Sequence, residues 1–331
     1  MTTINAAIVG LGWWGETIAR TLLDSTIIRP VLGVDPDDGR REAMAGGDMV
    51  VTGSYADALS DPNVDVVVLC TPHFLHAEQI IAAAEAGKHV FCEKPFAVTH
   101  AEARSALEAV SSAGVTVGIG HERRFEPAVE ALQQMLAEGA LGTPLMFEGN
   151  FSQNKFLTLP PDNWRLSSEL APVGPLSATG IHLVDLAISM FGRPETVWAR
   201  LATLATNFGN GDTLSVTLGF PSGATATVGA VLTTPFMGRV CVIGSEGWCE
   251  IRDRSHPEQS DGWDVRVTRA DGQVDEVHYP PFAAVRENLE RFADSISGRR
   301  PYPVTPDDIQ YNVDTFEAIV RSARTGRLES V

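Results

Sequence analysis

The chain has 331 residues, of which 44% are hydrophobic and 20% charged, and this is enough for about two globular domains. A formal net charge of −17 argues against nucleic acid and anionic membranes as partners, because both bind basic surfaces. Met1–Asn5 lacks the features of a secretion signal, and no run approaches the ~20 apolar residues of a membrane span, so we expect a cytoplasmic protein.

Short apolar runs alternate with helical patterns in the N-terminal part of the chain. The expected strands are 6–9, 30–34, 64–69, 89–92 and 115–119, and the expected helices are 14–24, 77–86 and 101–112. This alternation predicts βαβ units and a doubly wound parallel sheet. We therefore assign residues 1–124 to an α/β domain of the Rossmann type that binds a dinucleotide.

The pattern then changes to one helix followed by consecutive strands. The expected elements are a helix at 127–138, strands at 196–202, 214–220, 224–232, 239–243, 249–251 and 265–268, and helices at 284–297 and 307–325. Short turns between the strands predict a large open, mainly antiparallel sheet. Residues 125–331 are thus expected to form an α+β domain for substrate binding and oligomerisation. Val216, Leu218 and Phe220 are expected on the free face of this sheet, where a helix or partner would cover them.

A glycine-rich loop, Gly10-Leu-Gly12-Trp13-Trp14-Gly15, follows the first strand and opens a helix. Gly10 permits the tight turn, Gly12 lets a pyrophosphate approach the backbone, and Gly15 lets the helix pack on the strand. The phosphates would lie at the helix N-terminus, where amides point outward. We expect the two tryptophans of the loop to contact the dinucleotide as well.

Asp35 ends the second expected strand, where a carboxylate accepts hydrogen bonds from the ribose hydroxyls of NAD and repels the 2′-phosphate of NADP. Arg40 and Arg41 follow closely, and either could instead reach that phosphate. The sequence therefore favours NAD and leaves NADP open.

Two further motifs follow strands 64–69 and 89–92. Open α/β sheets bind ligands at the carboxyl ends of their strands. The residues expected to face the cofactor here are Thr71, Pro72, His73, His76, Glu93 and Lys94. This position places Lys94 near the nicotinamide.

Together with the glycine loop and the antiparallel second half, these motifs resemble the Gfo/Idh/MocA oxidoreductases over essentially the whole chain. The family is named for glucose–fructose oxidoreductase, inositol dehydrogenase and a rhizopine-catabolism protein. The resemblance implies that Lys94 reaches the nicotinamide ribose and the substrate hydroxyl, and that the Lys94–Pro95 bond is cis. It also implies a homodimer or homotetramer built through the C-terminal sheet. His76 either caps the helix that follows or faces the nicotinamide.

The segment 164–185 resembles a second family motif in which an aspartate precedes a histidine by four residues. Arg165, Gly174, Gly180, His182 and Asp185 match that motif. Pro172 and Val173 replace two glycines, and Ala178 replaces the aspartate. His182 suits general acid–base catalysis because imidazole titrates near neutral pH, but Ala178 cannot orient it. Asp185 shares a helix face with His182, and it either orients the ring or holds a loop.

Other candidates for substrate contact have structural alternatives. His121 belongs to the site or to the core, and Arg124 binds ligand or forms an ion pair between domains. Arg165 pairs with a substrate carboxylate or braces its loop, and Trp164 stacks on a sugar or fills the core. We expect loops 151–164 and 233–238 to set specificity.

We expect no metal site. The cysteines form no CxxC pair and the histidines are scattered, while His182 and Asp185 alone are too few to hold a catalytic zinc.

The sequence predicts an NAD(P)-dependent oxidoreductase. It would transfer hydride between nicotinamide C4 and a secondary alcohol carbon of a sugar, polyol or cyclic alcohol, with Lys94 and His182 in proton transfer. Two alternatives stay open, and Ala178 motivates the first of them. One is a non-catalytic NAD(P)-binding sensor or regulator, and the other is a redox-neutral lyase or glycosidase that uses NAD transiently.

Overall fold

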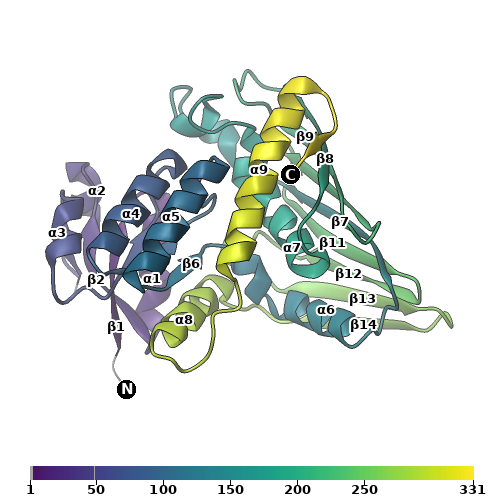
Figure 1. Ribbon diagram of the computed structural model, residues 1–331, viewed down its shortest axis with the longest axis horizontal. Coiled ribbons are helices and arrows are strands. Elements are labelled where there is room, and N and C mark those ends of the chain that lie inside the picture. The colour runs from purple at the N-terminus through teal and green to yellow at the C-terminus, as the bar shows by residue number, and fades with distance from the viewer. Residues whose placement is uncertain (1–2, 48) are drawn as a thin grey trace. The chain divides into compact units, whose positions relative to one another are not determined.

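The computed structural model describes residues 3–47 and 49–331, which form two compact units (Figure 1). One unit comprises Met1–Glu122 and Ala283–Gln310, and the other comprises Arg123–Phe282 and Tyr311–Val331. Met1 and Thr2, which begin the segment predicted to hold no secretion signal, lie outside the described residues. Within the described ranges, no helix combines the length and apolarity needed to cross a bilayer.

The first unit contains a six-stranded parallel sheet in the order β3-β2-β1-β4-β5-β6. Its strands are β1 (Ile4–Val9), β2 (Ile28–Val34), β3 (Val50–Thr52), β4 (Val66–Leu69), β5 (His89–Cys92) and β6 (Val117–Ile119). Its helices are α1 (Trp13–Thr21), α2 (Asp38–Met44), α3 (Tyr55–Ser60), α4 (His76–Glu85), α5 (His100–Ala113) and α8 (Ala284–Ile296). The strand order reverses between β1 and β4, which is the switch point at which Rossmann sheets bind ligands. The predicted doubly wound α/β fold is confirmed.

Helix α8 returns to the first unit from far along the chain. Leu289 and Phe292 belong to the same hydrophobic cluster as the β1 residue Ile8. Gly118 on β6 makes room for it, because a Cβ there would lie 2.6 Å from the Phe292 ring. The Tyr302 hydroxyl also bonds the Ile119 carbonyl at 3.1 Å. This differs from the expected assignment of all residues 125–331 to the second domain, because the apolar face of α8 is buried against the first sheet.

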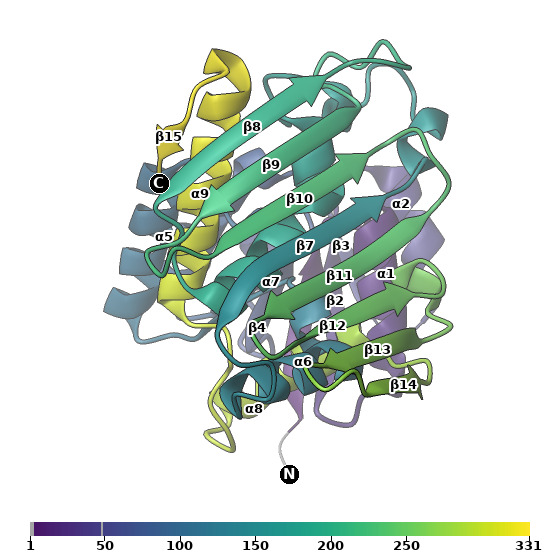
Figure 2. The same cartoon turned by 90° about the vertical axis from the view of Figure 1, so that its right-hand side faces the viewer.

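The second unit contains a nine-stranded sheet in the order β14-β13-β12-β11-β7-β10-β9-β8-β15 (Figure 2). Its strands are β7 (Pro144–Ser152), β8 (Thr196–Ala202), β9 (Thr213–Gly219), β10 (Thr225–Val231), β11 (Met237–Gly244), β12 (Gly247–Asp253), β13 (Trp263–Arg269), β14 (Val274–Tyr279) and β15 (Glu329–Ser330). Helices α6 (Pro127–Ala137) and α7 (Ile181–Phe191) belong to this unit, and the boundary between units falls within α9 (Pro306–Thr325). Among the described strands of this sheet, only β7 and β10 pair in parallel, so the mainly antiparallel sheet is confirmed.

The two faces of this sheet differ in polarity. Val216, Leu218 and Phe220 are buried in one hydrophobic cluster with the α9 residues Phe316 and Ile319. Alternation along the strand turns those three residues toward α9, so of the two expected covers, a helix or a partner, the structure shows the helix.

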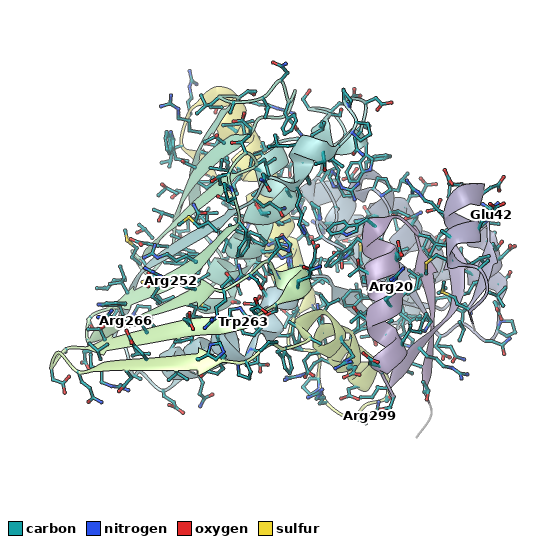
Figure 3. All side chains as sticks on the ribbon, turned by 180° about the vertical axis from the view of Figure 1, so that it is seen from behind. Arg20, Glu42, Arg252, Trp263, Arg266 and Arg299 are labelled. Carbon is teal, nitrogen blue, oxygen red and sulfur yellow. The ribbon has the colours of Figure 1, made fainter. Side chains whose placement is uncertain are left out.

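The opposite face carries polar and charged side chains. Arg239 on β11 bonds Glu250 on β12 at 2.6 Å and Glu148 on β7 at 3.0 Å. Arg252 and Arg266 project from β12 and β13 on the same face, while Trp263 is buried on the other side (Figure 3).

Several elements were not predicted from the sequence. They are α2, β3, α3, β7, β14 and β15. The strand β7 contains Gly149 and Asn150, which are poor strand formers, yet it is central because β10 and β11 pair on either side of it. Pairing with β10 and β11, rather than local strand propensity, stabilises β7.

Candidate active site

The glycine loop of the first unit has the geometry that a dinucleotide requires. Gly10 has φ +91°, and a Cβ there would lie 2.9 Å from the carbonyl carbon of Cys70. A Cβ on Gly15 would overlap the carbonyl oxygen of Gly10. A Cβ on Gly12, in contrast, would have the Arg40 guanidinium as its nearest neighbour, 3.7 Å away. Two glycines therefore close the turn, and the third leaves its outer side open.

Helix α1 begins directly after this open position. Gly12 is its N-cap and supplies no side-chain hydrogen bond, so the first-turn amides are available to an anion. Trp13 is 56% exposed, and its ring centroid lies 5.4 Å from that of Trp14. The residues present fit the pyrophosphate of a nicotinamide dinucleotide.

Asp35 lies at the end of β2, but its carboxylate is almost fully buried. Oδ2 accepts from the Leu11 amide at 2.8 Å, and Oδ1 accepts from the Asp37 amide at 3.0 Å. Nη1 of Arg40 lies 3.3 Å from Oδ2. The Arg41 guanidinium donates to the Asp35 carbonyl at 2.6 Å. Asp35 thus braces the glycine loop, and two arginines adjoin it.

Lys94 is half-buried directly after β5, and its bond to Pro95 is cis, as the resemblance implied. The Lys94 amide donates to Oε2 of Glu93 at 3.2 Å. A Cβ on Gly120 would overlap the Glu93 carboxylate, so this glycine provides the space that Glu93 occupies. Burial raises the pKa of Glu93 to about 7, while Trp14 and Lys94 act in the opposite direction.

His76 holds the loops after β4 and β5 together. It is the first residue of α4 and is buried, and its ring nitrogens lie 2.7 Å from the Pro95 carbonyl oxygen and 3.0 Å from that of Thr71. Burial lowers the pKa of His76, against the opposing effect of these two carbonyls. The ring therefore positions the segment that carries Lys94.

The other candidates of this unit lie in the same loops. The Thr71 hydroxyl donates to Gln79 at 2.5 Å, and Pro72 precedes the short 3-10 helix His73–Leu75. His73 and His121 are both buried, at 4% and 1% exposure. His121 follows β6 in the first unit.

His182 lies in the first turn of α7 in the second unit, and it is 4% exposed. Its ring centroid is 6.0 Å from that of Phe151 at the end of β7. The Thr179 hydroxyl donates to the Phe151 carbonyl at 2.7 Å, which ties the segment before His182 to β7. Phe151 thus begins a predicted specificity loop and contacts the predicted catalytic histidine.

The segment before His182 is irregular. Leu176–Gly180, which includes Ala178, is a π-helix that runs directly into α7. Val173 has φ +54°, a conformation that costs a β-branched residue about 1–2 kcal/mol. This is a position at which the family motif has glycine. A strained residue and a π-helix together are typical of functional segments.

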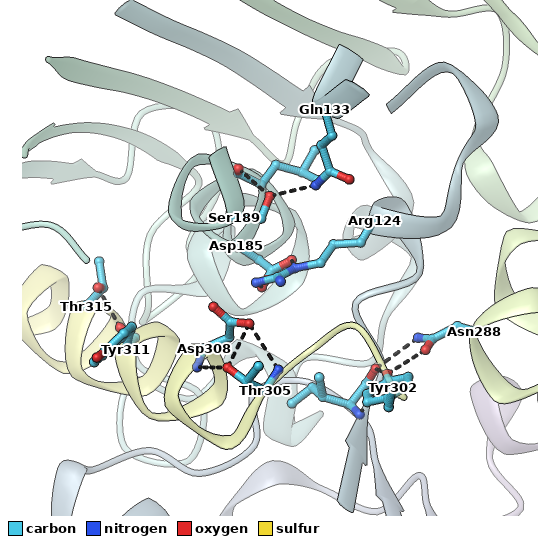
Figure 4. Close-up of polar contacts among 12 residues, drawn as sticks. Arg124, Gln133, Asp185, Ser189, Asn288, Tyr302, Thr305, Asp308, Tyr311 and Thr315 are labelled. Carbon is cyan, nitrogen blue, oxygen red and sulfur yellow. Dashed lines mark hydrogen bonds and ion pairs between the residues drawn. The ribbon is translucent and has the colours of Figure 1, made fainter. Parts of the chain in front are cut away.

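Asp185 forms an ion pair with Arg124. Both of its oxygens accept from the Arg124 guanidinium at 2.7 Å, and both side chains are buried (Figure 4). Breaking such a pair leaves a buried charge and costs about 3–5 kcal/mol. This geometry supports an ion-pairing role for both residues, but the pair lies within the second unit and not between domains as expected for Arg124.

Sequence reasoning missed an aromatic and histidine cluster around Phe151. The rings of Phe236 and His256 lie 6.0 Å and 5.7 Å from it, and the Arg123 guanidinium lies 5.4 Å from its centroid. Nζ of Lys155 is 3.3 Å from Nδ1 of His256. No sequence motif marks His256, because it lies in a polar loop distant from β7 along the chain.

Trp164 and Arg165 stack on each other, with 4.4 Å between the guanidinium carbon and the ring centroid. The Asn210 amide donates to the carbonyls of Arg165 at 2.7 Å and Ala171 at 2.8 Å, so it holds this loop. A Cβ on Gly174 would lie 2.8 Å from the Asn210 side chain, which explains the matched glycine.

The fold and these residues define a class of protein. A Rossmann unit with an open glycine loop, joined to a sheet unit that carries a buried histidine, is typical of dinucleotide-dependent oxidoreductases. In the described residues, no group of three His, Cys, Asp or Glu side chains is arranged to hold a metal ion.

Comparison with known proteins identifies the family. Residues 4–121 match the family described as "Oxidoreductase family, NAD-binding Rossmann fold", and residues 129–250 match the "GFO/IDH/MocA C-terminal domain". The chain belongs to the Gfo/Idh/MocA oxidoreductases, as the motifs indicated.

Similar proteins span most of the chain. The uncharacterized oxidoreductase YrbE of Bacillus subtilis is 31% identical, covering 78% of this chain and 75% of its own length. The scyllo-inositol 2-dehydrogenase (NAD(+)) of B. subtilis is 29% identical over 98% of this chain and 95% of its own. The crystal structure of aldose-aldose oxidoreductase from Caulobacter crescentus complexed with glycerol has a TM-score of 0.87 and 27% identity, covering all of both chains.

The raised pKa of Glu93 predicts a pH-dependent stability of the protein without cofactor. Between about pH 4.5 and 7, Glu93 is protonated in the folded state and ionised in the unfolded state, so stability falls as pH rises through this range. The total loss is about 3 kcal/mol. Urea unfolding across pH 4–8 should show this slope of the free energy of unfolding against pH, and Glu93→Gln should flatten it.

The control is Glu108→Gln, at a surface pair with Arg104, and this variant should keep the slope. An unchanged slope in Glu93→Gln would contradict the assignment.

Proposed function

We propose that the chain transfers hydride between nicotinamide C4 and a secondary alcohol carbon of a sugar, polyol or cyclic alcohol. The observation that carries this proposal is the position of Lys94. It lies at the carboxyl edge of the parallel sheet, which is the edge that carries the glycine loop. The relatives that act on inositol and aldoses support this substrate class.

The chain's own residues would bind the reactants and move one proton. The bound dinucleotide supplies the hydride acceptor or donor. Lys94 binds the nicotinamide ribose and the substrate hydroxyl, and its ammonium stabilises the developing alkoxide. His182 would take the hydroxyl proton as general base, with the Lys94 amino group as the relay, because imidazole side chains in general titrate near neutral pH. Phe151 packs against the His182 ring.

We assign the remaining candidates to supporting roles. Gly10, Gly12, Gly15, Trp13 and Trp14 form the pyrophosphate subsite. Thr71, Pro72 and His73 line the nicotinamide end, while Glu93 and His76 hold Lys94 in position. Trp164 and Arg165 are the proposed substrate contacts outside catalysis. His121, Arg124 and Asp185 act through packing and ion pairing.

Replacing Lys94 with methionine tests the catalytic assignment. Turnover should fall by about 10²- to 10⁴-fold, because the proton relay and the positive charge are both lost. Calorimetry should show NADH binding within about threefold of wild type, since the glycine loop is untouched. Lys94→Arg keeps the charge but cannot release a proton, so it should bind substrate normally and remain slow.

The outcomes separate the alternatives. Near-normal turnover of Lys94→Met on a panel of polyols and sugars would sink the assignment. Tight NADH binding by the wild type without turnover of any alcohol or ketone would identify a sensor. A product with no net redox change would identify a lyase or glycosidase that uses the dinucleotide transiently.

Restoring the carboxylate at position 178 tests the role of His182. Ala178→Asp places an anion one turn before the imidazole, which favours the charged ring and raises its pKa. The acidic limb of the kcat/KM profile should therefore move to higher pH by about one unit. Ala178→Asn is the matched control, because it has the same shape without the charge. Equal profiles for the two variants would contradict the assignment of His182 as base.

We also propose a division of labour and an assembly. The first unit binds the dinucleotide, and the second binds substrate and forms a homodimer or homotetramer through the outer face of its sheet. Support comes from that face, where Trp198 is 39% exposed in a cross-strand row with Thr217 and Thr227. Light scattering should give a mass above that of one chain, and Thr217→Arg should reduce it to the monomer. A monomeric wild type would contradict the assembly.

The four cysteines are free thiols, which supports the expected cytoplasmic location.

A further inference from the structure

Asn210 lies in the loop between β8 and β9 (residues 203–212, the β8–β9 loop), which the sequence did not indicate as part of the site. It is 1% exposed, and its amide donates to the carbonyls of Arg165 at 2.7 Å and Ala171 at 2.8 Å. Its own carbonyl accepts from the Gly174 amide at 2.7 Å. One residue of the β8–β9 loop therefore fixes three main-chain groups of the segment that begins at Arg165.

The oxygen of the Asn210 side chain indicates that this position serves more than stability. In the described part of the chain, Oδ1 is buried without a hydrogen-bond partner, and a Cβ on Gly174 would lie 2.8 Å from it. Buried acceptors of this kind destabilise a fold, and exceptions to local rules are expected at functional sites. The unpaired oxygen is consistent with a side chain that is retained for its two N–H bonds.

Asp212 fixes the shape of the loop that presents Asn210. Its carboxylate is fully buried and accepts from the amides of Leu204 at 3.0 Å, Ala205 at 2.8 Å and Thr206 at 2.9 Å. The Thr206 hydroxyl donates to the same carboxylate at 3.0 Å. Hydrogen bonds to an ionised group are about twice as strong as neutral ones, so this loop is a firm support for Asn210.

The segment that Asn210 holds depends on such outside contacts. Residues 167–173 form turns and bends rather than a helix or strand. Arg165 precedes them, and the π-helix before α7 begins two residues after Gly174. The strained Val173 comes directly before the Gly174 amide that Asn210 binds, and strain persists only where neighbouring contacts impose it.

We propose that the β8–β9 loop determines substrate specificity, with Asn210 as the positioning residue for the Trp164–Arg165 pair. This inference rests on the proposed function, and it adds a third loop to the two at 151–164 and 233–238 that the sequence indicated. Asn210 acts indirectly, because it fixes the main chain of Arg165. The guanidinium then meets the substrate in one orientation, and preorganised contacts of this kind favour binding.

Steady-state kinetics of Asn210→Ala in the full-length chain test this inference, with the best substrate of the polyol and sugar panel. KM should rise by about 10-fold, because two hydrogen bonds that hold the substrate loop are lost. The kcat should change by less than about threefold, since Lys94, His182 and the main-chain bond to Gly174 remain. The matched control is Asn312→Ala, which removes an equally buried asparagine side chain on α9 and should leave KM unchanged.

A double-mutant cycle with Arg165→Ala separates positioning from a general loss of stability. If Asn210 acts by placing Arg165, the double variant should have the KM of Arg165→Ala alone, within about twofold. Losses that multiply in the double variant would overturn the inference. A KM in Asn210→Ala equal to that in Asn312→Ala would overturn it as well.

Thr206→Val keeps the test informative if Asn210→Ala does not fold. It removes one donor to Asp212 and leaves the Asn210 amide in place, so KM should rise by a smaller factor of about two to five. Hydrogen exchange of residues 165–174 needs no substrate, and it should be faster in either variant than in Asn312→Ala. Equal exchange would overturn the inference, whereas a wild type that turns over no alcohol or ketone would refute the proposed function.

Discussion

The close approach of β1, α1 and β4 is the constraint on which the dinucleotide half of the structure depends. Gly10 lies against the Cys70 backbone, and Gly15 lies against Gly10, so no side chain fits at either position. The amides at the start of α1 can point at a ligand only because this turn is so compact. The same packing sets the positions of the loops after β4 and β5, which His76 then joins through the carbonyls of Thr71 and Pro95.

The sequence predicted the strands and loops that carry the dinucleotide site well because their signals are local. Strand β5 and the glycine loop follow from short-range patterns of apolar residues and glycine. The predictions fail where contacts distant in sequence decide the structure. Strand β7 has weak strand propensity and is made by its two neighbours, and α8 joins the first unit through Phe292. The β9 sequence predicts an apolar face at Val216 but does not show whether a helix or a partner covers it, and only the structure identifies α9 as the cover.

The candidate site shows the same difference between local motifs and contacts that are distant in sequence. Lys94 and His182 are candidates because each lies in a motif, whereas His256 joins the Phe151 cluster only through folding. Asp185 shows the opposite case. Its spacing from His182 fits a catalytic pair, but Arg124 uses both of its oxygens. Spacing along a helix establishes that two side chains share a face, and only the surrounding structure decides which partner each one takes.

The chain and its dinucleotide cofactor both carry a net negative charge. The groups next to the phosphates therefore determine whether the cofactor binds. A net charge of −17 repels any anion, but salt at physiological strength screens charges beyond about 8 Å. Within that range the glycine loop presents backbone amides, and Arg40 offsets the Asp35 carboxylate. A long polyanion would span many screening lengths and meet the whole acidic surface. A dinucleotide meets only this small region, and this is why the composition argues against nucleic acid while the loop still binds phosphate.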